Sequence, residues 1–363
     1  MKVCHVITTI ESGGAEKQLL LLAKQQVDYG LDVSVIYLKG KLDLQKQMVL
    51  AGINVLSQFA GKSFFSQVRL MRNYQKLNPG TIVHAHLPRS EILCALSLRS
   101  KSFVTTRHNA ERFFPKAPKL LSILLSNFVA YRAFVIISIS QSVSAFLHKH
   151  YEVPIKYRDQ IIYYGFNTSR SRKVQDYKTL GKVRLGTISR LVPQKNLPLM
   201  LEALLSFRDS YRIPCVLEIV GEGFQESYLR NLSEELGIAQ NVEWRGKISD
   251  VDQFYRDIDL FLLTSRYEGF GLVLLEAMSH TLPIVAAANP AILEVLSEEH
   301  PGIVFSNSPT EFAKRINLLL ANKVIWERAI EVQEKQLNSF SIEETTRAYM
   351  GVYSNLARLN EAH

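Results

Sequence analysis

The feature that most constrains the fold is a regular alternation of short apolar runs with longer helical patterns. In the first half the apolar runs are KVCHVIT, LDVSVIYL, INVL, TIVHAH, SFVTT and FVIISIS. They are typical of strands buried on both faces of a parallel sheet. Helical patterns lie between several of them: AEKQLLLLAKQQVDYG should end at Gly30, and FFSQVRLMRNYQKL should end before Asn78. The alternation predicts an α/β fold with a doubly wound sheet.

The alternation begins again after a polar stretch, SRSRKVQDYKTLG, which we expect to be an interdomain linker. The second set of strand-like runs is VRLGTIS, VLEIVG, NVEWRG, DLFLLTS, LPIVAAA and GIVF. A chain of 363 residues is long enough for two domains of ordinary size. We therefore predict two Rossmann-like domains, at residues 1–168 and 169–340, followed by a long helix at residues 341–363.

Composition narrows the class of protein. A hydrophobic share of 47% and a charged share of 21% fit a globular chain. The three cysteines have no CxxC spacing, which favours a reducing compartment over a disulfide framework or zinc site. MKVCHVIT runs directly into a strand-like pattern, so we expect no secretory signal. The most apolar stretch, Leu120 to Ile139, changes character near Arg132, which predicts a helix and then a buried strand rather than a membrane span.

Positive charge is concentrated in the first half. Residues 1–165 hold 21 Lys and Arg against 9 Asp and Glu, whereas the whole chain holds 43 against 34. Part of the excess is interleaved with aromatic residues, in the set Lys101, Phe103, Arg107, Arg112, Phe113, Phe114, Lys116 and Lys119. A basic surface with aromatic side chains can bind anionic lipid or nucleic acid. A solvated basic face with no partner, or attraction of an anionic soluble acceptor, would explain the same composition.

Parallel sheets bind ligands beyond the carboxyl ends of their strands, so the loops there are the candidate sites. After the first strand, Gly13 and Gly14 precede a helix, where the backbone could approach an anion or form a plain tight turn. After VRLGTIS, the loop RLVPQKN carries Arg190 and Lys195 and ends at Asn196, the expected helix N-cap. Two cations beside a helix N-terminus suit a diphosphate, although ordinary surface charges give the same pattern.

The stretch SRYEGFGLVLLEAM carries two carboxylates after the strand DLFLLTS. Glu268 lies in a glycine-rich loop, and Glu276 lies in the second turn of a helix that is apolar on nearly all sides. The Glu276 carboxylate needs donors there, from ligand hydroxyls, an internal ion pair or backbone N–H groups. The two carboxylates could also be the acid and base of a glycosidase. A diphosphate at Arg190 and Lys195 favours instead an enzyme that uses a nucleotide-activated sugar.

EGFGLVLLEAM, with two glutamates separated by seven residues, and SRLVPQKN resemble the retaining group 1 glycosyltransferases of the GT-B fold. GGAEKQ, TTRHN and the SIS strand end follow one another in the order usual for that family. The resemblance implies two Rossmann-like domains with a deep cleft between them and a C-terminal helix that packs back on the N-terminal domain. It implies that the first domain binds the acceptor and the second binds the nucleotide-sugar.

The resemblance also implies roles for matching residues. Glu268 would accept hydrogen bonds from the donor sugar and Glu276 from the ribose, while His108 of TTRHN would reach the sugar from the N-terminal domain. Arg190 and Lys195 would hold the diphosphate and stabilise the charge on the leaving nucleotide. The other expected donor-binding residues are Gly14, Lys247, Ile248, Phe270, Gly271 and Leu272. The family needs no metal and no other cofactor.

Some segments depart from the family pattern or stand outside it. The hinge sequence Asn-Gly-φ-Asp appears as YYGFN, with Tyr164 for Asn and Asn167 for Asp, which leaves the interdomain contacts open. ANPAILE lacks the Gly-Gly pair usual before Glu294 and could alter the rim of the donor pocket. His84 and His86 alternate with apolar residues, but the sequence suggests no third or fourth metal ligand, so we expect a packing or acceptor-side role.

We expect a metal-independent hexosyl- or N-acetylhexosaminyltransferase that retains anomeric configuration. Its donor would be a UDP-sugar and its acceptor a glycan or lipid-linked molecule in O-antigen or capsule assembly. We expect the protein in the cytoplasm or bound to the anionic inner face of the cell membrane. We expect no nucleic acid partner. A nucleotide-sugar hydrolase or epimerase is an alternative. So is a noncatalytic sugar-nucleotide-binding protein, which the complete set of charged residues disfavours.

Overall fold

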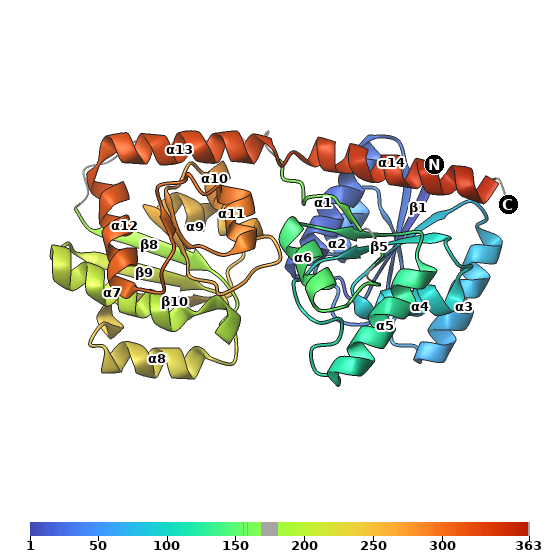
Figure 1. Ribbon diagram of the computed structural model, residues 1–363, viewed down its shortest axis with the longest axis horizontal. Coiled ribbons are helices and arrows are strands. Elements are labelled where there is room, and N and C mark those ends of the chain that lie inside the picture. The colour runs from blue at the N-terminus through green and yellow to red at the C-terminus, as the bar shows by residue number, and fades with distance from the viewer. Residues whose placement is uncertain (155, 158, 168–180, 362–363) are drawn as a thin grey trace. The chain divides into compact units, whose positions relative to one another are not determined.

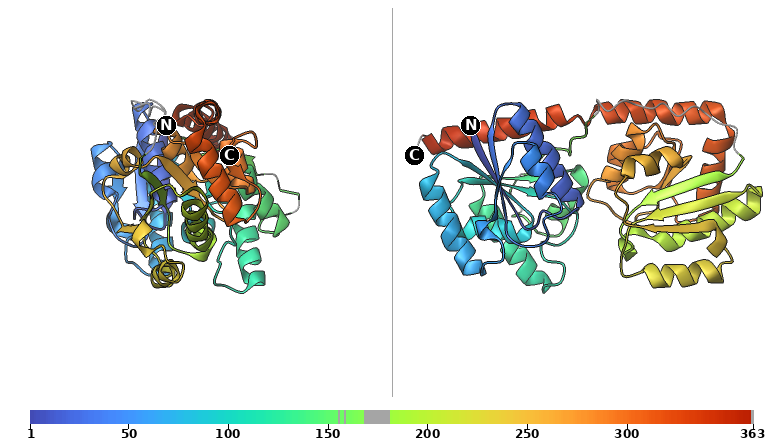
Figure 2. Two further views of the ribbon diagram at one scale, coloured as in Figure 1. Left: turned by 90° about the vertical axis from the view of Figure 1, so that its left-hand side faces the viewer. Right: turned by 180° about the vertical axis from the view of Figure 1, so that it is seen from behind.

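The computed structural model describes residues 1–154, 156–157, 159–167 and 181–361, without the side chains of residues 360 and 361. The chain forms two compact units (Figure 1). Unit 1 comprises Met1–Asn167 and Phe340–His363, and unit 2 comprises Thr168–Ser339. The expected linker SRSRKVQDYKTLG falls almost entirely outside the described residues. Each unit, taken by itself, is a parallel sheet with helices packed on it (Figure 2).

Unit 1 is built on a seven-stranded sheet of order β3-β2-β1-β4-β5-β6-β7. The predicted strands are confirmed as β1 (Lys2–Ile7), β2 (Asp32–Tyr37), β3 (Asn54–Leu56), β4 (Ile82–His86), β5 (Phe103–Arg107) and β6 (Val135–Ser138). The edge strand β7 (Gln160–Ile161) was not predicted, because two exposed residues carry no recognisable pattern. The interior strands are buried along nearly their whole length, as expected for parallel strands covered on both faces.

The helices of unit 1 are α1 (Gly14–Asp28), α2 (Gln45–Leu50), α3 (Phe64–Leu77), α4 (Pro88–Ser97), α5 (Lys119–Arg132), α6 (Gln141–Lys149) and α14 (Ile342–Glu361), with a short 3-10 turn, η1 (Ser57–Phe59). α3 ends at Leu77 with Asn78 as its C-cap, as predicted. The C-terminal helix α14 packs against α1 and buries Tyr353 in the core of this unit. The predicted return of the C-terminal helix to the N-terminal domain is therefore confirmed.

The apolar stretch from Leu120 is a helix, α5, followed by the buried strand β6, as predicted. Within the described residues, no helix combines the length and the apolar character needed to cross a bilayer.

Unit 2 is built on a six-stranded sheet of order β10-β9-β8-β11-β12-β13. The predicted strands are confirmed as β8 (Val183–Ile188), β9 (Cys215–Val220), β10 (Val242–Gly246), β11 (Leu260–Leu263), β12 (Ile284–Ala287) and β13 (Ile303–Val304). The connecting elements are η2 (Pro193–Lys195), α7 (Leu197–Tyr211), α8 (Glu226–Glu235), η3 (Ala239–Asn241), α9 (Val251–Asp257), α10 (Leu272–Ser279), α11 (Pro290–Leu296), α12 (Pro309–Ala321) and α13 (Lys323–Asn338). Leu185, Phe207 and Leu262 lie in its core.

Both sheets reverse their strand order once. In unit 1 the reversal lies between β1 and β4, and in unit 2 it lies between β8 and β11. At such a point the loops leaving the two adjacent strands turn in opposite directions, which opens a crevice at the carboxyl edge where ligands of doubly wound sheets bind. The fold therefore directs the search for a site to two loop pairs.

Only some of the residues expected to form a basic surface at residues 101–119 are exposed to solvent. Phe103 and Phe113 are buried in the core, and Arg107 is buried in an ion pair with Glu91, with Nε 2.9 Å from the carboxylate. The prediction was wrong for these three residues, because the run alternates between core and solvent. The exposed cations of this region are Lys101, Lys116 and Lys119.

Candidate functional site

The reversal point of unit 2 brings together the two charged residues that the sequence placed on separate loops. Lys195 ends η2 after β8, and Glu268 lies in the loop after β11. The Lys195 ammonium is 2.6 Å from a Glu268 carboxylate oxygen, and the two side chains are only 14% and 8% exposed. Removing either partner of an ion pair so shielded from water destabilises the fold, because the other charge is then left buried and unpaired. The meeting of these loops is explained by the adjacency of β8 and β11, whereas the ion pair itself was not predicted.

A short network of hydrogen bonds fixes the two loops to each other. The Thr264 hydroxyl lies 3.0 Å from the Lys195 carbonyl and 3.1 Å from the Asn196 carbonyl. The Gln194 side chain donates to the Tyr267 carbonyl, and the Arg266 N–H donates to the Gln194 carbonyl. The Lys195 side chain therefore projects from a rigid frame, as a binding site requires.

Asn196 occupies the expected N-cap position of α7, but its side chain makes no capping bond. Its φ is 51°, in the left-handed region, and its side-chain oxygen accepts a hydrogen bond of 3.3 Å from Arg266. The position was predicted correctly and the bonding was not. Arg266 is an exposed cation of the site that sequence reasoning missed, because nothing in SRYEGFG separates it from an ordinary loop arginine.

The glycine turn after β9 supports the same edge. The Leu191 N–H donates to the Glu222 carbonyl, which holds this turn against the loop after β8. A Cβ on Gly221, whose φ is 127°, would lie 2.0 Å from the Ser189 carbonyl oxygen, so only glycine fits. Beside this turn, the Arg190 side chain is exposed and has no hydrogen bond or ion pair among the residues described. Arg190 is therefore a solvated cation next to the loops that carry Lys195 and Glu268.

Glu276 lies in the second turn of α10, as predicted, and its internal donor is a hydroxyl group. The Tyr255 hydroxyl donates to the Glu276 carboxylate over 2.9 Å. Burial, and then the charge of Glu276, raise the pKa of Tyr255 well above its usual value, so it stays a donor. The Tyr255 hydroxyl is thus an internal donor to Glu276 that the sequence did not suggest.

The remaining residues expected to bind the donor lie along the same edge of unit 2. Gly271 is the N-cap of α10, with a φ of 95°, and Leu272 is the first helical residue. The Phe270 side chain is buried, which leaves only its backbone to face a ligand. Lys247 is exposed and Ile248 is half-buried just after β10.

In unit 1 the glycine turn favours the structural alternative. Gly14 is the first residue of α1 and Gly13 its N-cap. The nearly buried Glu16 carboxylate folds over Gly13, where a Cβ would lie 2.2 Å from its oxygen, and accepts a bond of 2.6 Å from the Thr9 hydroxyl. This helix start therefore already faces a carboxylate, which disfavours a second anion there.

His108 follows β5 and ends a buried chain of imidazoles. His108 Nε2 is 3.1 Å from His86 Nδ1, and His86 Nε2 is 3.0 Å from His5 Nδ1. His5 Nε2 is 2.8 Å from the side-chain amide oxygen of Gln26, while the Tyr164 hydroxyl bonds His108 Nδ1 at the other end. The Gln26 oxygen can only accept, so each imidazole carries its proton on Nε2 and Tyr164 donates to His108.

All four clustered histidines are neutral. Burial lowers the pKa of His5 to about 4, and burial together with the Arg107 charge lowers that of His108 to about 3. Burial, followed by the neighbouring histidines, lowers the pKa values of His84 and His86 well below the usual range. At neutral pH the four imidazoles therefore carry no charge.

His5 is the third imidazole that the sequence did not suggest beside His84 and His86. One nitrogen from each of the three lies within 4.8 Å of the others, a spacing that could hold a metal ion. However, both nitrogens of each ring already have hydrogen-bond partners; those of His84 are the Tyr353 and Thr106 hydroxyls. The structure therefore favours the packing role expected for His84 and His86.

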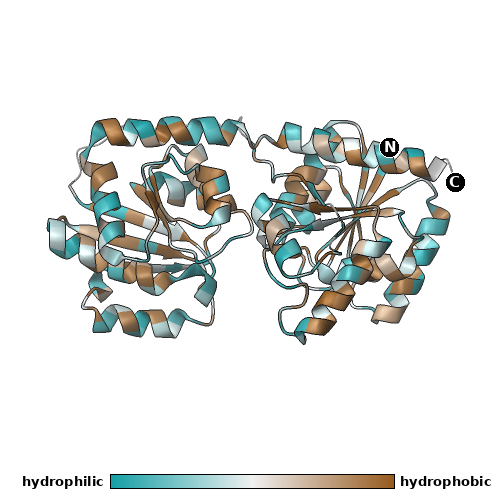
Figure 3. Ribbon diagram, in the orientation of Figure 1, coloured by the Kyte–Doolittle hydropathy of each residue, from teal (hydrophilic) through white to brown (hydrophobic). Residues whose placement is uncertain are grey.

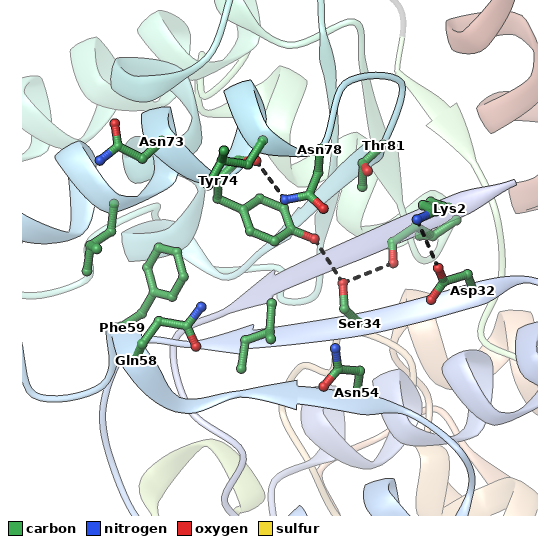
Figure 4. Close-up of a pocket in the computed structure, with 14 residues that line it drawn as sticks. Lys2, Asp32, Ser34, Asn54, Gln58, Phe59, Asn73, Tyr74, Asn78 and Thr81 are labelled. Carbon is green, nitrogen blue, oxygen red and sulfur yellow. Dashed lines mark hydrogen bonds and ion pairs between the residues drawn. The ribbon is translucent and has the colours of Figure 1, made fainter.

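A separate pocket of about 470 Å³ lies at the opposite edge of the unit 1 sheet, where the strands begin (Figure 4). Its wall includes an ion pair of 3.5 Å between Lys2 and Asp32 and a hydrogen bond of 3.2 Å between Ser34 and Tyr74. This amino edge is far along the strands from the loops described above, so the pocket is not part of the candidate site.

Two doubly wound units in one chain, the second with a charged reversal point, define the GT-B class of fold. The crystal structure of Anabaena HepE in complex with UDP-glucose is similar, with a TM-score of 0.80 at 20% identity, over 98% of this chain and 100% of that one. The family described as glycosyl transferases group 1 matches residues 170–336, and glycosyltransferase family 4 matches residues 12–170. The chain belongs to the group 1 GT-B glycosyltransferases, which confirms the resemblance inferred from its motifs.

Its relatives include enzymes of surface polysaccharide synthesis. The lipopolysaccharide core biosynthesis mannosyltransferase LpsB of Rhizobium meliloti is 27% identical over 251 residues, which are 64% of this chain and 69% of LpsB. An uncharacterized glycosyltransferase of Haemophilus influenzae is 29% identical over 138 residues, which are 38% of this chain. That match spans only 39% of the length of the Haemophilus protein.

Proposed function

We propose that this protein transfers a sugar from a UDP-sugar to a glycan or lipid-linked acceptor in the synthesis of a bacterial surface polysaccharide. The observation that carries the proposal is the shielded pair of Lys195 and Glu268 at the β8/β11 reversal point. A cation there suits a diphosphate, and a carboxylate beside it suits the hydroxyl groups of the attached sugar. The likeness to a protein crystallised with UDP-glucose supports the donor class, and the likeness to LpsB supports the pathway.

The charges at this edge explain how the donor would be activated. When the bond between the sugar and the phosphate breaks, negative charge grows on the leaving UDP, and Lys195 and Arg190 stabilise it. Glu276 binds the ribose hydroxyls while Tyr255 orients its carboxylate. Because these side chains supply the positive charge themselves, we expect transfer to proceed without a metal ion.

We propose retention through a front-face displacement. The Glu268 carboxylate is held by the Lys195 ammonium, which lowers its strength as a nucleophile and suits it to accept hydrogen bonds. The bond from the anomeric carbon to phosphate oxygen breaks while a bond to the acceptor oxygen forms on the same face. The acceptor proton passes to the leaving phosphate, so the products are UDP and the glycosylated acceptor.

Unit 1 would supply the acceptor side and one contact to the donor sugar. We propose that His108 makes this contact; because its two ring nitrogens are bonded to His86 and Tyr164, the sugar hydroxyl takes the place of one of these partners when it binds. The uncharged imidazole of His108 suits an uncharged sugar hydroxyl better than a phosphate. A lipid-linked acceptor would bring the enzyme to the inner face of the cytoplasmic membrane.

The test is a thermal-shift screen of UDP-, GDP- and ADP-sugars, followed by a product assay with membrane lipid extract in the presence of EDTA. A UDP-sugar should raise the melting temperature by mass action, and mass spectrometry should detect an acceptor heavier by one sugar. Release of free sugar at the same rate without acceptor would identify a hydrolase. No stabilisation by any nucleotide-sugar would refute the proposal.

A further inference from the structure

Helix α5 is oriented with its apolar side toward solvent. Its buried positions are Ser122, Ser126, Val129 and Ala130, two of them hydroxyl residues. These hydroxyls bond inside the unit: Ser122 donates to the Glu152 carboxylate, and Ser126 donates to the Glu152 carbonyl. The large apolar residues are exposed instead: Leu120 by 69%, Leu121 by 46%, Leu124 by 58%, Phe128 by 38% and Tyr131 by 75%. A surface helix normally buries such residues.

The exposed residues form one continuous stripe. At 100° per residue, their positions fall within an arc of about 100° on the helix, and the buried positions lie on the opposite side. Scattered apolar residues are normal on a protein surface, but a contiguous row marks a site of interaction. Figure 3 shows the apolar colouring along α5, which packs on α4 through its other face.

Positive charge surrounds this stripe. The charge that counts here is the exposed charge, since Arg107 is buried against Glu91. Lys116 and Lys119 are exposed at the start of α5 and form no ion pair within the described parts of the chain. At the other end, the Lys101 ammonium lies 5.8 Å from the Tyr131 ring. An apolar face with a cationic border matches the boundary between acyl chains and anionic headgroups.

We propose that α5 docks this protein on an anionic lipid bilayer, with the stripe Leu120–Tyr131 in the acyl boundary and Lys101, Lys116 and Lys119 at the phosphates. A second copy of the chain fits less well. A single helix face offers much less than the roughly 800 Å² per partner of a stable interface, and two copies would bring their cationic borders together. The inference extends the proposed lipid-linked acceptor, since the acceptor lies in the surface to which α5 binds, but vesicle binding does not require transferase activity.

The test is flotation of the full-length protein with vesicles of phosphatidylcholine alone or mixed with phosphatidylglycerol. Wild type should float with the mixed vesicles and much less with phosphatidylcholine. The double variant Leu124→Glu/Phe128→Glu should lose binding by about tenfold or more, because two apolar anchors are replaced by repelled charges. The matched control is Phe224→Glu, which changes a 79% exposed residue of unit 2 and should bind as wild type.

A second pair of variants separates the charges from the stripe. Lys116→Gln/Lys119→Gln should weaken binding to the mixed vesicles and make it less sensitive to salt, since fewer phosphate contacts are screened. Binding that is unchanged in both double variants would overturn the inference. Sedimentation without vesicles gives a second way to overturn it. If the wild type is a dimer and Leu124→Glu/Phe128→Glu is a monomer, the stripe is a protein interface and not a membrane anchor.

The same proteins should be tested for stabilisation by UDP. Variants of α5 that keep the UDP-induced shift are folded and have an intact donor site, so their loss of flotation reports on the helix alone. Wild type that is stabilised by UDP but never floats would refute the membrane inference and leave the proposed function standing. Wild type that floats but is not stabilised by any nucleotide-sugar would refute the proposed function and leave the membrane inference standing.

Discussion

The two units share a doubly wound topology, but the side chains at the carboxyl edge of the sheet, where the strand order reverses, differ between them. At the reversal point of unit 2, Lys195 and Glu268 form a shielded ion pair, with the cations Arg190 and Arg266 beside it. At the corresponding edge of unit 1, His5, His86 and His108 form a neutral chain of hydrogen bonds. The doubly wound sheet fixes where a ligand can bind, while the side chains at the edge determine which ligand.

Under the proposed function, this difference gives the units separate tasks. A diphosphate carries charge that needs cations held in place, which unit 2 provides. A sugar hydroxyl needs donors and acceptors of fixed direction, which unit 1 provides through imidazoles whose protons have defined positions. We therefore expect substitutions in unit 2 to change affinity for the nucleotide and those in unit 1 to change the handling of the sugar.

The largest effect should come from the ion pair in unit 2. Lys195→Ala should lower kcat/KM by about 100- to 1,000-fold, because the charge on the leaving UDP loses its nearest cation. Glu268→Ala should cause a comparable loss, and the double variant should lose less than the product of the two, since each single change strands a shielded charge. Steady-state kinetics with UDP-sugar measure this; the exposed Lys314→Ala on α12 is the control. Near-normal turnover in both single variants would contradict the assignment.

The histidine chain of unit 1 should make stability depend on pH. The pKa of His5 is about 4 when folded and about 6.5 when unfolded, so the unfolded chain binds more protons between these values. Stability should therefore fall as the pH drops below about 6.5, by on the order of 2 kcal/mol for one such histidine at about pH 5. Calorimetric melting at several pH values measures the slope, which His5→Gln should reduce. An unchanged slope in that variant would exclude His5 as a source.

The contact expected between Glu276 and the ribose predicts a smaller and more specific effect. Glu276→Gln should weaken UDP binding by about tenfold, the value of one charge-assisted hydrogen bond. It should leave the affinity for 2′-deoxy-UDP nearly unchanged if the carboxylate binds the 2′-hydroxyl. Calorimetric titration of both nucleotides measures this difference. Equal losses for the two nucleotides would show that the carboxylate does not bind the 2′-hydroxyl.

The smallest effect should come from Tyr164, which bonds His108 in unit 1. Tyr164→Phe removes the donor to His108 Nδ1 and frees that ring to change tautomer, so kcat should fall by a few-fold to about tenfold. UDP affinity should not change. Tyr163→Phe, which removes a hydroxyl bonded to Gln141, is the neighbouring control. A loss of UDP affinity in Tyr164→Phe would break the division of tasks between the units.

The sequence was sufficient for most of the fold because buried parallel strands leave strong apolar patterns. The strands of both sheets were predicted apart from β7, whose two exposed residues have no pattern. The C-terminal end of α3 followed from Asn78, Pro79 and Gly80. The polar side of α5 could not be assigned, because Ser122 and Ser126 are typical of a solvent face until Glu152, far along the chain, is seen to bond them.

The sequence suggested residues for the candidate site but not the contacts that they make. Lys195, Glu268 and Glu276 stood out because charges in apolar or glycine-rich loops need a reason. Their partners did not, since Thr264 and Tyr255 are ordinary residues within strand and helix patterns. His5 was missed because an imidazole in a buried strand gains meaning only from His86, which strand pairing brings beside it from distant sequence.

The most direct test of the account is a calorimetric titration of UDP, which lacks the sugar and so measures the diphosphate site alone. We predict that wild type and Tyr164→Phe bind UDP equally, while Lys195→Ala binds it at least about tenfold more weakly. Equal affinity in all three proteins, or a loss confined to the unit 1 variant, would contradict the claim that the charged edge of unit 2 holds the donor.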